Sequence, residues 1–187
     1  MRIIAGRYAS RQLETRKGRE TRPTLDKVRQ AVFSSLGGFF EGGIFLDLYA
    51  GSGANGLEAI SRGADQAIFV DASYQAIQYI KKNVISLGCE KQSRIMPMKD
   101  AKALKILVEE GIQLDYVYLD PPFAKQTNDQ VLSFLDEHQM MNEGGRVIIE
   151  SAEADHFDKE YTCLHPYKTV VYGSTRITYY EFRKPEE

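Results

Sequence analysis

A short apolar run that leads into a cluster of glycines constrains the fold of this chain more than any other feature. The run covers residues 44–49, the glycine-rich turn is Ala50–Gly56, and a helical stretch follows at residues 57–62. Glycine permits positive φ and lets a ligand approach the backbone closely, and the first turn of a helix offers unpaired N–H groups. We therefore predict a strand, a turn and a helix, with a nucleotide-like ligand across the turn.

Apolar runs and amphipathic stretches alternate along the rest of the chain. The apolar runs are residues 44–49, 67–70, 95–98, 115–119, 146–150, 169–172 and 176–182. The helical stretches run from Thr24 or Asp26 to about Leu36, then over residues 73–87, about 101–110 and about 128–138. This order predicts an α/β fold with a doubly wound, mainly parallel seven-stranded sheet. Gly173 and Ser174 predict a final hairpin and an antiparallel C-terminal strand, which is typical of the Rossmann-like class I methyltransferase fold.

Basic residues concentrate at the amino terminus. The 187 residues carry a net charge of −2, but residues 1–30 hold nine Lys or Arg against three acidic residues, a balance of +6 against −8 for the remainder. Such an arm attracts a polyanion, because phosphate neutralisation and counterion release supply most non-specific affinity. We predict one domain over residues 1–187, with a basic RNA-binding extension at residues 1–36 and a catalytic core at residues 40–187. A solvated tail is the alternative for the extension.

Several features are expected to be absent. The amino terminus lacks the long apolar stretch of a signal peptide, and no run has membrane-spanning length. Cys89 and Cys163 lack the spacing of metal ligands, and the three histidines are scattered. We therefore expect a cytoplasmic protein with neither a disulfide nor a metal site.

Acidic residues around the glycine turn favour one cofactor over another. Gly51, Gly53 and Gly56 satisfy the pattern G-x-G-x-x-G, which alone would also suit an NAD-linked dehydrogenase. Asp47 lies in the strand four residues before the first glycine, where it can accept from the ammonium of S-adenosylmethionine or hold the turn. Asp71 closes the second apolar run, about twenty residues beyond the first glycine, where it can accept from both ribose hydroxyls. We favour S-adenosylmethionine over a dinucleotide.

The residues Asp120, Pro121, Pro122 and Phe123 follow the apolar run at 116–119 and predict a site for methylating a base amine. Two prolines remove amide donors and fix φ, and the residue before each proline is held extended. The Asp120 carboxylate and the Pro121 carbonyl can then accept from a planar NH2 group, and the Phe123 ring can stack on the base. An ordinary strand-ending turn is the alternative.

Three separated motifs resemble those of the bacterial RsmD-type 16S ribosomal RNA guanine-N2 methyltransferases. Residues 22–29 (RPTLDKVR), residues 46–53 with 56–59 (LDLYAGSG and GLEA) and residues 120–123 (DPPF) are similar to the motifs of that family in order and spacing. The resemblance extends over nearly the whole chain. It implies S-adenosylmethionine as the methyl donor and the N2 amine of a 16S rRNA guanine, of the guanine-966 type, as the acceptor. It also implies action on the small ribosomal subunit or its assembly intermediate.

The predicted site residues form three groups. The catalytic residues are Asp120, Pro121, Pro122 and Phe123, and the RNA-binding residues are Arg7, Arg22, Thr24 and Arg29. The cofactor-binding residues are Asp47, Tyr49, Ala50, Gly51, Ser52, Gly53, Asn55, Asp71, Asp100, Ala101 and Asp120. By resemblance, Asp100 would accept from the adenine amine and Ala101 would donate its N–H to the ring; a helix-capping role is the alternative for Asp100. The family more often has Phe, a small or apolar residue and Glu where this chain has Tyr49, Asn55 and Asp71.

Two other functions are compatible with the same motifs. A DNA adenine-N6 methyltransferase could use the same tetrapeptide, because it also serves adenine and cytosine amines. A non-catalytic RNA-binding or assembly factor could keep the fold without the chemistry. The chain shows no DNA target-recognition domain, and its tetrapeptide and glycine turn are intact, so both alternatives rank below RNA methylation.

Overall fold

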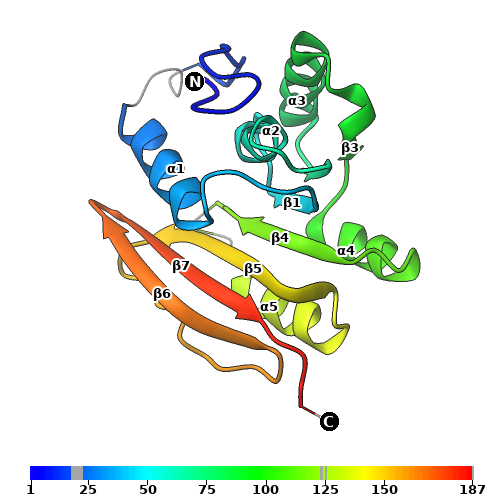
Figure 1. Ribbon diagram of the computed structural model, residues 1–187, viewed down its shortest axis with the longest axis vertical. Helices are drawn as coiled ribbons and strands as arrows, with labels where there is room; N and C mark the ends of the chain where they lie inside the picture. Colours follow the sequence, from blue (N-terminus) through cyan, green and yellow to red (C-terminus); the bar gives the residue numbers. More distant parts are fainter. Residues whose placement is uncertain (18–22, 123, 125, 187) are drawn as a thin grey trace. The chain divides into compact units, whose positions relative to one another are not determined.

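The computed structural model describes residues 1–17, 23–122, 124 and 126–186 (Figure 1). The predicted site residues Arg22 and Phe123 lie outside the described residues, as does the side chain of Thr24. The chain divides into two units, Met1–Asp100 and Ala101–Glu187. The single domain that the composition suggests stays a prediction.

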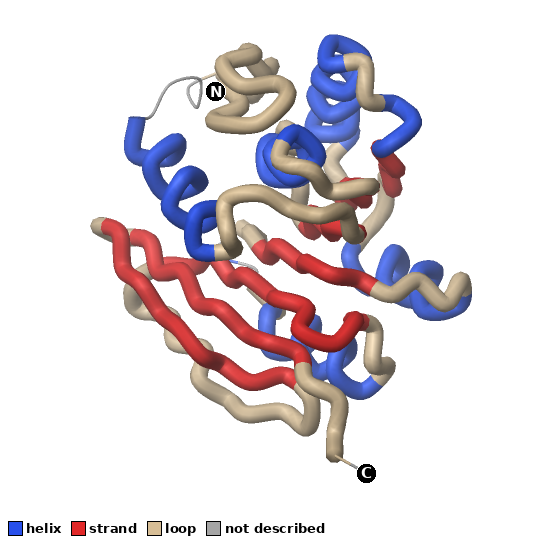
Figure 2. The backbone as a smooth tube through the Cα atoms, in the orientation of Figure 1, coloured by secondary structure: helices blue, strands red, loops and turns tan. Residues whose placement is uncertain are grey.

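The first unit contributes three short parallel strands to the seven-stranded sheet, whose strands are red in Figure 2. The three strands are β1 (Ile44–Leu48), β2 (Gln66–Val70) and β3 (Ser93–Met96), in the order β3-β2-β1. The first two are mostly apolar and almost wholly buried, as parallel strands with both faces covered should be. The helices of this unit are α1 (Pro23–Ser35), α2 (Ala54–Ser61) and α3 (Tyr74–Leu87), with a 3-10 turn η1 at Glu90–Gln92.

Helix α3 has the ends and the apolar face that its sequence predicts. The Ser73 hydroxyl accepts from the Ala76 N–H at 3.3 Å, which caps the amino end. Gly88 ends the helix in the left-handed conformation, with φ 67°. The predicted apolar stripe is buried; its members are Ile77, Ile80, Val84 and Leu87.

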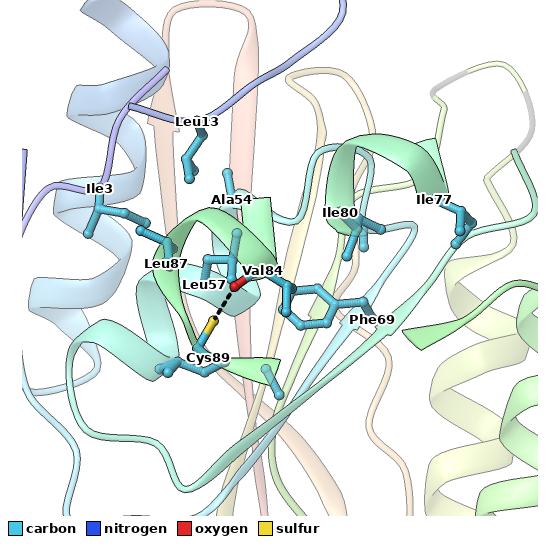
Figure 3. Close-up of a cluster of buried hydrophobic side chains, with 13 residues drawn as sticks. Ile3, Leu13, Ala54, Leu57, Phe69, Ile77, Ile80, Val84, Leu87 and Cys89 are labelled. Atoms are coloured by element: carbon cyan, nitrogen blue, oxygen red, sulfur yellow. Dashed lines mark hydrogen bonds between the residues drawn. The ribbon is translucent and has the colours of Figure 1, made fainter. Parts of the chain in front are cut away.

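The N-terminal arm, residues 1–17, packs against the rest of the first unit over most of its length. It folds back on itself through a bridge between Arg2 and Gln12. Ile3 and Leu13 are buried, and Figure 3 shows them among the side chains of an apolar cluster contributed mainly by α2 and α3. Burial of these two side chains holds the arm in place through the hydrophobic effect. The alternative of a solvated tail is therefore wrong for this part of the chain.

Backbone contacts fix the arm to the carboxyl end of α2. The Arg7 N–H donates to the Ser61 carbonyl at 2.8 Å, and the Tyr8 N–H donates to the Ser61 hydroxyl at 2.9 Å. That hydroxyl donates in turn to the Ala5 carbonyl at 2.7 Å. Gly6 lies in the same turn with φ +87°, and a Cβ there would lie 2.0 Å from the Ser61 carbonyl oxygen. Only glycine fits this close approach.

A buried carboxylate on α2, that of Glu58, joins the arm to two arginines. Its two oxygens accept from the Ile4 N–H at 3.0 and 3.1 Å. The Arg29 Nε lies 3.8 Å and the Arg62 Nη2 3.5 Å from Oε1. Burial raises the pKa of Glu58, and the two guanidinium groups oppose that rise. The cluster links the arm, α1 and α2 within the first unit.

Arg29 takes a structural position that corrects one prediction. Its side chain was expected to bind RNA, but the residue is only 5% exposed. Besides its approach to Glu58, its Nη2 donates to the Arg2 carbonyl and to Asp26 Oδ1, the latter at 3.1 Å. A guanidinium that is buried and engaged in this way cannot face a phosphate backbone. We therefore assign Arg29 to the packing of α1 and the arm on α2.

The second unit carries the remaining four strands, β4 (Leu114–Leu119), β5 (Met141–Ala152), β6 (Leu164–Tyr172) and β7 (Thr175–Phe182). Their order is β4-β5-β7-β6; β4 and β5 are parallel, and β7 is antiparallel to both of its neighbours. The helices are α4, which spans Asp100–Glu109 and starts at the last residue of the first unit, and α5 (Asn128–Glu137). The predicted C-terminal hairpin, which turns at Gly173 and Ser174, is confirmed.

Strand ends differ from the predictions where pairing extends a strand beyond its apolar run. The predicted strand at 146–150 is the middle of β5, and the predicted strand at 169–172 is the end of β6. β6 begins five residues earlier because it pairs with β7 from Leu164 opposite Phe182 onward. Pro166, which obscures the strand pattern, lies next to a register shift that accommodates it.

Among the described residues, none of the helices has the length and apolar character needed to cross a membrane. The same part of the chain contains no group of three or more His, Cys, Asp or Glu side chains arranged to hold a metal ion. Cys89 and Cys163 are both buried free thiols.

Candidate functional site

The glycine turn after β1 has the backbone conformation that its sequence predicts. Tyr49, Gly51 and Gly53 all have positive φ, with values of 65°, 58° and 83°. A Cβ on Gly51 would meet no atom within 4 Å, so this part of the turn is open to an approaching ligand. A Cβ on Gly53 or Gly56 would instead press on the Phe69 ring of β2, at 3.2 and 2.4 Å. The first glycine leaves room for a ligand, and the other two allow close packing of α2.

Asp47 stabilises this turn through a hydrogen bond from the backbone of the turn. Its Oδ2 accepts from the Gly56 N–H at 2.9 Å, and the residue is 1% exposed. A carboxylate in this place does the work of an N-cap for α2, because Gly53 at the cap position has no side chain to do so. This geometry supports the turn-holding role, and the role as an acceptor for an ammonium group stays a prediction.

Asp71, at the end of β2, is tied to the same turn. Its Oδ2 accepts from the Gly51 N–H at 2.9 Å, and its Oδ1 accepts from the Ser73 N–H at 2.8 Å. A carboxylate oxygen has two lone pairs, so each oxygen can accept one further hydrogen bond. The half-buried side chain is therefore oriented by the backbone and retains the capacity to accept from two ribose hydroxyls.

Tyr49 and Asp100 form a direct pair. The Tyr49 hydroxyl donates to Asp100 Oδ2 at 2.5 Å. Asp100 is the first residue of α4, and Ala101 follows it in the first turn. The hydrogen bond fixes the rotamer of the carboxylate, because a short bond to a charged acceptor is directional and strong. The structure thus joins two predicted cofactor residues that lie fifty-one positions apart in the sequence.

We predict that Tyr49→Phe weakens cofactor binding. Loss of the hydroxyl removes one hydrogen bond to Asp100, which is worth about 1 kcal/mol, so the Kd for S-adenosylhomocysteine should rise about fivefold. Calorimetric titration checks this value. The matched control is Tyr79→Phe on α3, whose hydroxyl accepts from the Gln75 side chain at 3.1 Å. An unchanged Kd in Tyr49→Phe would show that Asp100 needs no partner for binding.

The first unit therefore offers a donor and acceptor set that fits an adenosine-containing cofactor. Gly51 presents open backbone, and Asp71 and Asp100 each present a carboxylate oriented by a hydrogen bond; their roles toward ribose and the adenine amine stay predictions. The other predicted cofactor residues of the turn line the same segment; Ala50 is buried, and Ser52 and Asn55 are half-buried. When bound, S-adenosylmethionine would supply an electrophilic methyl group on a sulfonium.

The second unit carries the predicted catalytic segment at the end of β4. Asp120 is half-buried, Pro121 is buried and Pro122 is exposed. Behind them, the Tyr118 hydroxyl donates to Glu150 Oε2 at 2.8 Å. Burial raises the pKa of Tyr118 well above its usual value, and the carboxylates of Glu150 and Asp120 raise it further. Tyr118 therefore stays protonated and keeps donating to Glu150. This hydrogen bond joins β4 to β5 close to Asp120.

Sequence reasoning gave no individual role to three polar residues of this framework, namely Glu58, Asn83 and Glu150. Asn83 interrupts the otherwise apolar face of α3 at a buried position, and Glu150 ends the apolar run of β5 at a half-buried position, so each left a weak signal in the sequence. Arg7, which was predicted, is exposed; its Nη2 donates to Gln92 at 2.6 Å and its guanidinium lies over the Tyr8 ring. Its RNA-binding role stays a prediction.

Known proteins are similar to this chain in sequence. The family described as Conserved hypothetical protein 95 matches residues 1–181. The putative rRNA methyltransferase YlbH of Bacillus subtilis is 35% identical over 183 residues, 98% of this chain and 100% of that protein. The ribosomal RNA small subunit methyltransferase D of Escherichia coli K12 is 30% identical over 151 residues, 81% of this chain and 74% of that protein.

A solved structure extends the similarity to the fold. The putative methyltransferase yhhF from Escherichia coli has a TM-score of 0.82 and 27% identity, and the match covers 98% of each chain. The predicted Rossmann-like class I methyltransferase fold, with its antiparallel C-terminal strand, is confirmed.

Proposed function

The chain belongs to the family described as Conserved hypothetical protein 95, that of the RsmD-type methyltransferases, and from this we propose that it methylates the N2 amine of a guanine in 16S ribosomal RNA. Methylation of small-subunit ribosomal RNA is the activity that the relatives' names support. The guanine, the N2 position and S-adenosylmethionine as donor are the finer parts of the proposal. The substrate would be the RNA within the small ribosomal subunit or an assembly intermediate.

The observation that carries the proposal is Asp120 followed by two prolines at the carboxyl end of β4. A half-buried carboxylate there can accept one N–H of a planar amine, and the Pro121 carbonyl can accept the other. The hydrogen bond between Tyr118 and Glu150 stabilises the strand end that carries this acceptor pair. Such a site orients an exocyclic amine without a nucleophilic side chain.

The chemistry asks for positioning more than for strong base catalysis. Guanine N2 is a poor nucleophile, because its lone pair is delocalised into the ring. Hydrogen bonds to Asp120 and to the Pro121 carbonyl favour a pyramidal nitrogen whose lone pair can attack the methyl carbon. The new N–C bond forms as the S–C bond breaks, and the amine then loses a proton to Asp120 or to water. The target base must leave its stack to reach these groups.

The test is methyl transfer from labelled S-adenosylmethionine to small ribosomal subunits that lack the modification. Naked 16S RNA and duplex DNA are assayed in parallel, and the products are identified by nucleoside mass analysis. Formation of N2-methylguanosine in the small subunit is the expected result, and mapping would locate the modified guanine. Methyladenine in DNA would instead establish the adenine-N6 alternative. Cofactor binding without transfer to any of the three acceptors would favour a non-catalytic assembly factor.

We predict that the double variant Arg16→Ala, Lys17→Ala weakens RNA binding and flattens its dependence on salt. Both side chains are exposed on the arm. Each phosphate contact that is lost should lower the slope of log K against log salt by about 0.7 to 0.9. Filter binding from low to moderate salt measures that slope. Lys105→Ala on the exposed face of α4 is the control, and an equal loss in that variant would mean that the arm has no special role.

A further inference from the structure

A single buried amide, that of Asn83, bonds both the N-terminal arm and the cofactor turn. Asn83 lies on α3 and is 1% exposed. Its Oδ1 accepts from the Glu14 N–H at 2.7 Å, and its Nδ2 donates to the Glu14 carbonyl at 2.9 Å and to the Ser52 carbonyl at 3.0 Å. An asparagine Nδ2 has two hydrogens, so both of its donors are used.

The hydrogen bond from Asn83 to Ser52 lies in the part of the glycine turn where glycines flank a single residue. Ser52 stands between Gly51 and Gly53, which both have positive φ. Peptides flanked by glycines rotate at little cost, so a hydrogen bond to the Ser52 carbonyl helps to select one orientation of the turn. The Ser52 hydroxyl makes a second contact with the arm, to the Met1 sulfur at 3.7 Å. The arm therefore contacts the turn directly through Met1 and indirectly through Asn83.

The bond to Glu14 reaches the part of the arm that carries exposed positive charge. Arg16 and Lys17 follow Glu14 within three residues, and Arg11 precedes it by three; all are exposed. Phosphates that bind these side chains would restrain the backbone to which Asn83 is bonded. The apolar side of the same segment is held by Leu13, which is buried in the cluster of Figure 3. Bound phosphates would thus further restrain a segment of the arm that Leu13 already holds in place.

We propose that Asn83 is a positioning residue that couples RNA binding on the arm to cofactor binding at the turn, so that each ligand raises the affinity for the other. The inference rests on the proposed function, because it takes the turn as the cofactor site and the arm as the RNA site. A coupling of this kind is reciprocal, since both ligands stabilise the same arrangement of the arm, Asn83 and the turn. It would favour loading of cofactor onto enzyme that is already bound to RNA.

The experiment compares cofactor affinity with and without RNA in the full chain. Labelled S-adenosylhomocysteine, which cannot react, is titrated by equilibrium dialysis in the presence or absence of unmodified small ribosomal subunits. The wild-type affinity should rise at least about fivefold when the particle is present, at the lower end of typical couplings. In Asn83→Leu, which has no hydrogen-bonding group, and in Asn83→Asp, which has no donor, the ratio should fall to about one.

Two matched variants separate the amide from general effects. Glu14→Gln changes only an exposed side chain, paired with Lys82 at 3.6 Å, and leaves the backbone bonds to Asn83 in place, so it should keep the wild-type ratio. Val84→Ala alters the neighbouring buried side chain, which belongs to the same apolar cluster as Leu13 but has no hydrogen-bonding group. It should lower stability and also keep the ratio. Loss of coupling in Val84→Ala would show that destabilisation, rather than the Asn83 amide, is the cause.

Two further outcomes would distinguish failure of the coupling from failure of the proposed function. Equal affinity with and without the particle in the wild type would overturn the coupling while leaving the methyltransferase function intact. Failure of the wild type to bind S-adenosylhomocysteine would overturn both. Amide hydrogen exchange on the wild type avoids any folding defect of the variants: S-adenosylhomocysteine should slow exchange of the Glu14 N–H, and an unchanged rate would contradict the coupling.

Discussion

Replacement of Asp120 by alanine is expected to lower the rate of methyl transfer about 100- to 1,000-fold at saturating substrate. The carboxylate accepts from the amine, and this interaction strengthens as the nitrogen becomes pyramidal and positively charged, so its loss acts mainly on the transition state. The Kd for S-adenosylmethionine should change much less. Single-turnover methyl transfer to small ribosomal subunits measures the rate, and calorimetry measures cofactor binding.

Two variants show whether the loss belongs to the Asp120 carboxylate. Asp120→Asn keeps one acceptor oxygen but not the charge, so its rate should lie between those of the wild type and Asp120→Ala. Asp115→Ala removes an acid from the opposite end of β4, where Asp115 accepts from Asn142 at 3.1 Å, and should leave the rate unchanged. An undiminished rate in Asp120→Ala would remove Asp120 from the mechanism. A parallel loss of rate and cofactor binding would place its role at the cofactor.

The elements that sequence reasoning found are those whose signal is local. Helix α3 carries its cap at Ser73, its apolar stripe and its terminal glycine within sixteen consecutive residues, and all three were predictable. Strand β6 was found only at its carboxyl end, because Pro166 interrupts the pattern and the pairing with β7 extends the strand past it. A strand end that depends on a partner strand has no local signal.

The same distinction between local signals and long-range contacts applies to the candidate site. The strand, glycine turn and helix and the place of Asp120 at the end of β4 were predictable from local spacing, while the roles of Asp71 and Asp120 stay predictions. The bonds of Asn83 to the arm were not predictable, since they join residues 69 positions apart. Arg29 was misassigned for a related reason: the positive charge was visible in the sequence, but its buried partner Glu58 was not.

Replacement of Gly6 by alanine is expected to detach the arm and to lower the free energy of unfolding by about 3 kcal/mol. The residue has φ +87°, and a new Cβ would lie 2.0 Å from the Ser61 carbonyl oxygen. That atom is backbone at the end of α2, so relief must come from the arm. Moving the arm breaks its bonds to Ser61 and exposes Ile3, which is fully buried. Urea unfolding measures the stability, and limited trypsin cleavage at Arg11 reports on the arm.

The chain contains a control that isolates the clash from backbone strain. Gly38 has φ +83°, nearly that of Gly6, but a Cβ there would meet nothing within 4 Å. Gly38→Ala should therefore cost only the strain of a left-handed residue, about 1 to 2 kcal/mol, and leave the arm resistant to trypsin. Equal effects of the two variants would show that the contact with Ser61 does not hold the arm. If the arm does detach in Gly6→Ala, Asn83 loses Glu14 as its partner, and cofactor affinity should no longer respond to RNA.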